Sequence, residues 1–159
     1  MTLSNIDGAL QVLTIDLNGE TFALEAGLVR EILDTVHVTD VPGADPFVSG
    51  LINVRGRVVP LADPRLRFGM NAAAATIDSR FVVIEIDLDG DPTTIALRAD
   101  KVHEVTELPV ETLEATPAIG MKWRPEYIRC VGKRGEDFVI VLDIERVLTG
   151  QLLPDMALH

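Results

Sequence analysis

The sequence lacks the features that mark membrane-inserted and secreted proteins. Among its 159 residues there is a single cysteine, Cys130, which excludes an internal disulfide. No apolar run approaches the roughly 20 residues that a membrane-spanning helix needs. The opening MTLSNIDGAL also lacks the basic and apolar regions of a signal peptide. We therefore expect a cytoplasmic protein without direct membrane insertion, in which Cys130 is a buried structural thiol.

Positive charge is also scarce. Fourteen lysines and arginines stand against 25 acidic residues, which gives a net charge of −11. Because nucleic-acid phosphates are held by clustered basic side chains, we expect no nucleic-acid partner. The one local concentration of basic residues has two interpretations: a contact for an acidic patch on a partner protein, or solvated charges that flank strands. Its members are Arg55, Arg57, Arg65 and Arg67.

Motifs of catalysis and metal binding are missing as well. The three histidines, His37, His103 and His159, are scattered without a second ligand at metal spacing. No G-x-S-x-G elbow, Walker loop or G-x-G-x-x-G occurs. One catalytic hypothesis remains, a hydrolase that pairs the carboxylates of Asp63 and Asp143. Both aspartates are also typical helix N-caps, so we expect no enzyme, no metal and no cofactor.

What the sequence does contain is a series of short apolar segments separated by turn residues. Apolar residues make up 47% of the chain and aromatic residues only 4%. Residues 42–69 show the pattern most clearly, because the apolar segments 48–54 and 57–62 flank Arg55-Gly56. This arrangement predicts two strands joined by a tight turn.

Cap and turn signals place further elements. Asp63 before Pro64, and Asp143 in the second half of the chain, predict the N-caps of two short helices. The dipeptide Asn18-Gly19 predicts a two-residue hairpin turn. Residues 28–38 fit either a helical turn that runs into a strand or a strand alone.

A later hairpin carries a conflicting signal. Strands predicted at residues 81–88 and 94–97 flank Asp89-Gly90. Pro92 follows this dipeptide closely, and proline donates no hydrogen bond to a strand ladder. We therefore expect a looser loop here than in the first hairpin.

The chain contains an internal repeat. Residues 50–63, GLINVRGRVVPLAD, resemble residues 130–143, CVGKRGEDFVIVLD, at an offset of 80. Earlier blocks repeat in the same order, VLTIDLNG as VVIEIDLDG and FAL as IAL. The ordered agreement predicts two similar halves, approximately 10–70 and 80–150, with a linker near 71–79.

One of these repeated segments carries a family signature. The run F-V-x-G-x-x-N-x-R-G-x-x-V-P-x-x-D-x-R, residues 47–65, resembles the core signature of CheW-like domains, the coupling modules of bacterial chemotaxis. Other blocks match in the same order, among them LTIDLNGETFAL, VREIL, FVVIEIDLDG and VLDIERVL. The resemblance covers about residues 10–148, nearly the whole chain.

The resemblance implies a mainly all-β fold. CheW-like domains consist of two intertwined five-stranded SH3-like β-barrels around a shared apolar core, with short helices. By this resemblance, residues 1–159 form a single CheW-like domain. The two halves of the internal repeat are consistent with such a pair of barrels.

The resemblance also implies a function. Members of this family are adaptors without enzymatic activity that connect a CheA-type histidine kinase, through its regulatory domain, to the cytoplasmic hairpin tip of chemoreceptors. We expect the chain to be cytoplasmic and recruited to membrane receptor arrays. Two alternatives remain: a stand-alone regulatory module for a histidine kinase without receptor contact, and the paired-aspartate hydrolase.

Three positions carry family roles by resemblance. Val29 and Glu31 match residues implicated in receptor binding, and Arg55 matches an arginine associated with receptor and kinase coupling. Val29 also fits an ordinary core valine. The chain departs from the family pattern at Pro64, at Cys130, and at Arg98, which interrupts a segment that is commonly apolar.

Overall fold

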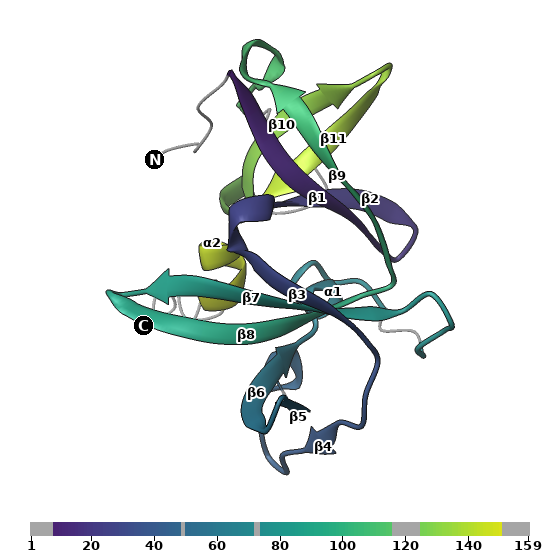
Figure 1. Cartoon of the computed structure of the whole chain (residues 1–159), viewed down its shortest axis with the longest axis vertical. Coiled ribbons are helices and arrows are strands. Elements are labelled where there is room, and N and C mark those ends of the chain that lie inside the picture. Colours follow the sequence, from purple (N-terminus) through teal and green to yellow (C-terminus); the bar gives the residue numbers. More distant parts are fainter. Residues whose placement is uncertain (1–7, 49, 72–73, 116–124, 151–159) are drawn as a thin grey trace.

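The computed structural model describes residues 8–48, 50–71, 74–115 and 125–150, and its strands form two curled sheets (Figure 1). We call the five-stranded sheet the first barrel; its order is β10-β11-β2-β1-β9. Its strands are β1 (Ala9–Leu17), β2 (Glu20–Glu25), β9 (Lys101–Pro109), β10 (Ile128–Arg134) and β11 (Asp137–Leu142).

The other sheet, which we call the second barrel, has the order β3-β7-β8-β6-β5-β4. Its strands are β3 (Val29–Asp34), β4 (Thr39–Asp40), β5 (Gly50–Val54), β6 (Arg57–Ala62), β7 (Arg80–Leu88) and β8 (Asp91–Ala99). Five strands were expected, and the sixth, β4, is only two residues long.

Each barrel combines strands from both halves of the chain. The first barrel takes β1 and β2 from the N-terminal half and β9 to β11 from the C-terminal half, whereas the second barrel joins β3–β6 to β7 and β8. The predicted fold class, two intertwined barrels of mainly β structure, is therefore confirmed. The single-domain assignment over residues 1–159 stays a prediction, and positions 72–73 of the predicted linker lie outside the described residues.

The two halves are joined by matching parallel pairs. In the first barrel β11 runs parallel to β2, with Val141 opposite Ala23. In the second barrel β6 runs parallel to β8, with Leu61 opposite Ala96. Ala23 and Ala96 are counterparts in the sequence repeat, at an offset of 73. The repeat thus corresponds to a repeated structural unit.

Four hairpins among the described residues close through two-residue turns. In three of them both central residues have positive φ, which is the geometry of a type I′ turn: Asn18-Gly19, Arg55-Gly56 and Asp89-Gly90. The expectation of a looser loop near Pro92 was wrong. Pro92 lies inside β8, opposite Asp87 and next to the pair Leu88–Asp91 that closes the turn. At this position of an antiparallel ladder the backbone N–H points away from the partner strand β7. Proline, which has no N–H, therefore costs no hydrogen bond to β7.

Short helices begin where caps were predicted. The Asp63 carboxylate accepts a hydrogen bond from the Arg65 N–H at the start of α1 (Pro64–Arg67). The Asp143 carboxylate accepts one from the Arg146 N–H at the start of α2 (Ile144–Thr149). Ahead of β3, the 3-10 helix η1 (Ala26–Leu28) decides between the two alternatives for residues 28–38 in favour of a helical turn followed by a strand. The other 3-10 helices are η2 (Pro46–Val48), η3 (Val110–Thr112) and η4 (Pro125–Tyr127).

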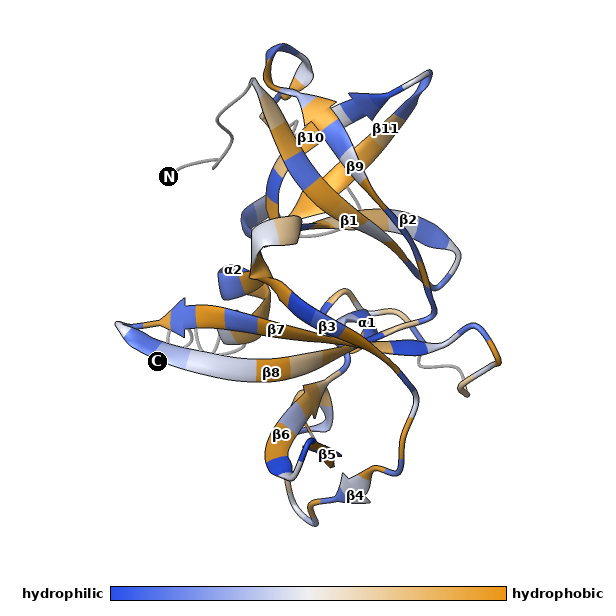
Figure 2. Cartoon of the chain, viewed as in Figure 1, coloured by the Kyte–Doolittle hydropathy of each residue, from blue (hydrophilic) through white to orange (hydrophobic). Residues whose placement is uncertain are grey.

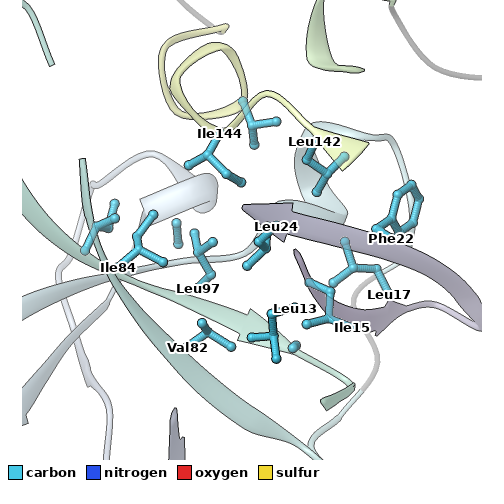
Figure 3. Close-up of a cluster of buried hydrophobic side chains, with 14 of the residues drawn as sticks. Leu13, Ile15, Leu17, Phe22, Leu24, Val82, Ile84, Leu97, Leu142 and Ile144 are labelled. Atoms are coloured by element: carbon cyan, nitrogen blue, oxygen red, sulfur yellow. The ribbon is translucent and has the colours of Figure 1, made fainter. Parts of the chain in front are cut away.

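A central cluster of buried apolar side chains lies between the two barrels, with α2 beside it (Figures 1 and 3). Leu13 and Leu24 of the first barrel point into the same space as Ile84 and Leu97 of the second (Figure 3). Each barrel has a further cluster of its own. Figure 2 shows apolar residues along the strands and hydrophilic residues at the hairpin tips. Because the central cluster draws on both barrels, hydrophobic burial holds them together.

Within the part of the chain that the structure describes, no helix has the length and hydropathy that crossing a bilayer requires.

Candidate protein-binding site

The turn at Arg55 has an unusual backbone for its sequence. Arg55 has a φ of 54° and Gly56 a φ of 83°. The only other non-glycine residues with positive φ in the described ranges are Asn18 and Asp89, whose types tolerate this conformation. The Asn53 side chain supports the turn, since its oxygen accepts a 2.8 Å hydrogen bond from the Gly56 N–H. The turn thus holds a long cationic side chain at a place where asparagine or glycine is usual.

The Arg55 guanidinium forms a two-bonded ion pair with Glu31. Its Nη2 donates to Glu31 Oε2 at 2.8 Å and its Nε donates to Oε1 at 3.2 Å. The Arg55 side chain is 76% exposed, whereas the Glu31 side chain is 24% exposed. The hydrogen bonds to Glu31 raise the pKa of Arg55. The pair therefore orients a permanent positive charge whose outer face remains open to solvent.

A second ion pair lies beside the first. Arg30 Nε is 3.1 Å from Glu85 Oε1, and Arg30 also donates to the Gly27 carbonyl at 3.0 Å. Together the two pairs border a hollow of about 260 Å³. Its lining residues come from β3, β5–β6, β7 and β8: Arg30, Glu31, Val54, Arg55, Arg57, Val59, Val83, Glu85 and Thr94. The hollow combines an apolar floor with charged walls, as protein-contact surfaces do.

Val29 does not belong to this hollow. The pairing of β3 with β7 shifts between Val29 and Glu31, so Arg30 is the extra residue of a β-bulge. Val29 lies opposite Ile84 of the central cluster and packs against that cluster. Glu31 lies opposite Val83, which belongs to the second barrel's own cluster. The bulge therefore turns Val29 and Glu31 to opposite faces of the sheet.

The predicted arginine cluster separates into different environments. Arg65 is 2% exposed and forms ion pairs with Asp63 and Asp100, each at 2.9 Å. Arg67 donates a 2.7 Å hydrogen bond to the Val147 carbonyl, and its guanidinium lies 3.8 Å from the ring centroid of Phe47. These two arginines are structural and do not form a surface for an acidic partner. Arg55 and Arg57 remain exposed.

The two aspartates of the hydrolase hypothesis are engaged as caps. Asp63 caps α1 and also accepts from Arg65 Nε and Nη2, both at 2.9 Å. Both oxygens of the Asp63 carboxylate are thus engaged by the guanidinium, an arrangement that does not suit a catalytic carboxylate that must reach a substrate. Asp143 caps α2. Among the described residues, no group of three or more potential ligands is placed to hold a metal ion.

Sequence reasoning named three candidate residues, Val29, Glu31 and Arg55, but missed the relation between them. It assigned Glu31 and Arg55 separately and grouped Glu31 with Val29. The structure pairs Glu31 with Arg55 and places Val29 on the other face. One sequence feature sets Arg55 apart: an arginine occupies the first position of a type I′ turn, whereas the other two turns of this type in the described residues read Asn-Gly and Asp-Gly.

Comparisons with known proteins agree with one another. The family model described as the CheW-like domain matches residues 11–151. The chain resembles the chemotaxis protein CheW of Klebsiella aerogenes, with 28% identity over 89% of this chain and 82% of that protein. It is 24% identical to the chemotaxis protein CheW of Treponema pallidum, over 95% of this chain and 89% of that protein. It is also 29% identical to the protein PilI of Pseudomonas aeruginosa, over 78% of this chain and 67% of that protein.

A solved structure has a similar fold. The crystal structure of the scaffolding protein TtCheW from Thermoanaerobacter tengcongensis superposes with a TM-score of 0.78. The match covers 92% of each chain at 23% sequence identity. At this identity the likeness establishes the architecture of the two barrels.

Proposed function

The chain belongs to the CheW-like domain family, and from this premise we propose that it is a non-enzymatic adaptor that couples chemoreceptors to a CheA-type histidine kinase. In this proposal one face binds the regulatory domain of the kinase and another receives the cytoplasmic hairpin tip of a receptor. The protein then works in the cytoplasm, recruited to receptor arrays at the membrane. The observation that carries the proposal is the exposed Arg55, held by Glu31 on a turn whose backbone disfavours arginine.

The mechanism we propose for Arg55 is the binding of a partner carboxylate. Glu31 occupies one edge of the guanidinium, and the remaining N–H groups face solvent. A receptor or kinase carboxylate can bind there with charge-assisted hydrogen bonds. Since the orientation is fixed before binding, less side-chain entropy is lost when the partner binds. Glu31 is thus a positioning residue and Arg55 the contact residue.

Apolar contact would come from the edge strands of the two sheets. Ile32 of β3 is 43% exposed and Val105 of β9 is 60% exposed, and the two are counterparts in the repeat. Receptor helices offer apolar side chains that such edges can bury. Val29 supports this surface from beneath, since it packs against the central cluster. We therefore propose that Val29 acts on receptor binding through packing.

Binding to each partner separately tests this proposal. The purified protein would be titrated calorimetrically with a kinase regulatory domain and with a receptor hairpin-tip fragment. Arg55→Glu should weaken receptor binding by about tenfold or more, because it replaces the contact charge with its opposite. Lys133→Glu is the matched control, since it reverses an exposed positive charge on the equivalent hairpin β10–β11, outside the hollow.

The outcomes separate the hypotheses. If both partners bind and only Arg55→Glu weakens receptor binding, the adaptor proposal stands. If the kinase domain binds and the receptor fragment does not, the protein is a stand-alone kinase regulator. If neither binds, the proposal is wrong and family membership describes the fold alone.

A further inference from the structure

A larger pocket opens on the second barrel, away from the Arg55–Glu31 pair. Its volume is about 540 Å³. It lies between the segment around β4 and η2, the strands β5, β6 and β8, and α1. Its lining is mostly apolar: Val38, Ala44, Pro46, Phe47, Gly50, Leu61 and Leu66, with Asp40, Asp63, Arg65 and Arg98 as the charged members. This volume falls in the range of small-molecule sites.

One charged residue of the pocket, Arg98, has no ion-pair partner among the residues that the structure describes. Arg98 lies opposite Phe81 on β7, with its guanidinium 5.4 Å from the ring centroid. It continues the row of β8 residues that face the second barrel's cluster, and it is half-buried. Within the described ranges Arg98 forms no ion pair, and of the two pocket carboxylates Asp63 is bound to Arg65 while Asp40 lies exposed at the rim.

The first barrel shows how the same position is used when the charge is balanced. Glu25 on β2 is the counterpart of Arg98, at the offset of 73 that relates Ala23 to Ala96. Glu25 forms an ion pair with Arg129 Nε at 2.9 Å. Position 49, the counterpart of Arg129 at the offset of 80, is a serine. Both barrels therefore have a charged residue at this strand position, Glu25 in the first and Arg98 in the second. Only the first barrel has a residue of opposite charge, Arg129, at the other position of the pair.

We propose that the second-barrel pocket binds a small amphipathic carboxylate, whose head group pairs with Arg98 and whose apolar tail lies against Phe47, Leu61 and Val38. A guanidinium is the preferred partner for a carboxylate because its fork of N–H groups matches the two oxygens. Burial of the tail supplies further free energy in proportion to the apolar area removed from water. The ligand carboxylate takes the place that a protein charge holds in the first barrel. This inference does not depend on the adaptor proposal, since it concerns a different surface.

Octanoate is a suitable probe, with 1-octanol as its uncharged analogue. The full-length ¹⁵N-labelled protein would be titrated with each compound at physiological salt while backbone amide shifts are followed. We expect saturable octanoate binding with shifts at the amides of Phe47, Leu61 and Leu66. Arg98→Gln should weaken octanoate binding by about tenfold, the cost of one charge-assisted pair. Arg57→Gln, which removes a charge from the neighbouring exposed strand end, should leave the affinity unchanged.

Leu66→Glu gives a second variant, because Leu66 is partly exposed and its replacement places a negative charge at the pocket mouth. It should weaken octanoate binding and spare octanol binding. The proposal is overturned if octanoate shows no saturable binding, if octanol binds as tightly as octanoate, or if Arg98→Gln and Leu66→Glu both bind octanoate like the wild type. It is supported if octanoate binds in preference to octanol and both variants lose affinity.

Discussion

The hairpins β5–β6 and β10–β11 occupy equivalent places in the two barrels and solve the same backbone problem differently. The first central residue of each turn has positive φ: Arg55 at 54° and Gly135 at 64°. Glycine enters this region without a Cβ penalty, whereas arginine does not. The β10–β11 turn has positive φ at Gly135 alone, whereas both central residues of the β5–β6 turn have it. At the first position of such turns the chain otherwise has Asn18 and Asp89; Arg55 stands there despite its cost, and its side chain forms the exposed pair with Glu31. The difference supports the proposal that the second barrel presents a binding group.

The helices that follow these hairpins differ more strongly, and here we expect the largest effect of mutation. Arg65 in α1 forms ion pairs with both Asp63 and Asp100. The second carboxylate oxygen of Asp100 accepts a 2.6 Å hydrogen bond from the Asn18 N–H. The counterpart of Arg65 in α2 is Glu145, which is exposed. Arg65→Met should lower the free energy of unfolding by about 3 kcal/mol, because it leaves two carboxylates without their shared cation.

Glu145→Ala is the matched substitution, and it should change the free energy of unfolding by no more than about 0.5 kcal/mol. Urea denaturation of both variants measures the comparison. Equal effects from the two substitutions, or a loss below about 1 kcal/mol in Arg65→Met, would mean that the buried network does not stabilise the second barrel.

An intermediate effect is expected at the turns themselves. Gly135→Ala should destabilise the protein by about 1 kcal/mol, because alanine carries a Cβ into positive φ. Arg55→Gly should leave stability unchanged or raise it, because the strain at the turn is relieved as the Glu31 pair is lost. Thermal unfolding monitored by circular dichroism can rank the two variants. A loss of stability in Arg55→Gly that exceeds the loss in Gly135→Ala contradicts the view that Arg55 is kept for its side chain.

The smallest effect concerns Cys130, whose counterpart in the second barrel is Gly50. Burial raises the pKa of the Cys130 thiol, so the folded state favours the neutral form. The stabilisation is complete below the unfolded pKa of about 8.5 and is lost as the pH rises toward the folded value. When the free energy of unfolding is plotted against pH, the curves of the wild type and of Cys130→Ala should therefore run parallel below pH ~8 and converge or cross above it. Parallel curves up to pH ~10 would show that the thiol ionises equally in both states.

Local signals in the sequence were sufficient for much of the fold. The dipeptide Asn18-Gly19 and the caps at Asp63 and Asp143 lie where they were predicted, because turns and helix starts depend on a few neighbouring residues. The repeat also predicted two related halves, and the structure has matching parallel pairs at the repeat counterparts Ala23 and Ala96.

The arrangement of the candidate site depends on contacts that no local pattern records. Glu31 and Arg55 are 24 residues apart, and two strands, β7 and β8, separate β3 from the β5–β6 hairpin in the sheet order. Only the curl of the sheet brings the two side chains together. The bulge at Arg30 is likewise hidden, since one extra residue in a strand reverses which face the next side chain takes. The family resemblance gave Val29 and Glu31 the same role, which stays a prediction, and it did not indicate that the two side chains lie on opposite faces of the sheet.

The central claim is that Arg55 contacts a partner while Glu31 only positions it, and a charge exchange tests this most directly. Receptor-tip and kinase-domain binding would be measured for Arg55→Glu, for Glu31→Arg and for the double variant that restores the pair in reverse. We predict that the double variant recovers the stability lost in the single variants but not the receptor binding, because the exposed charge has changed sign. Recovery of receptor binding in the double variant would contradict the claim and make the ion pair itself, rather than Arg55, the functional feature.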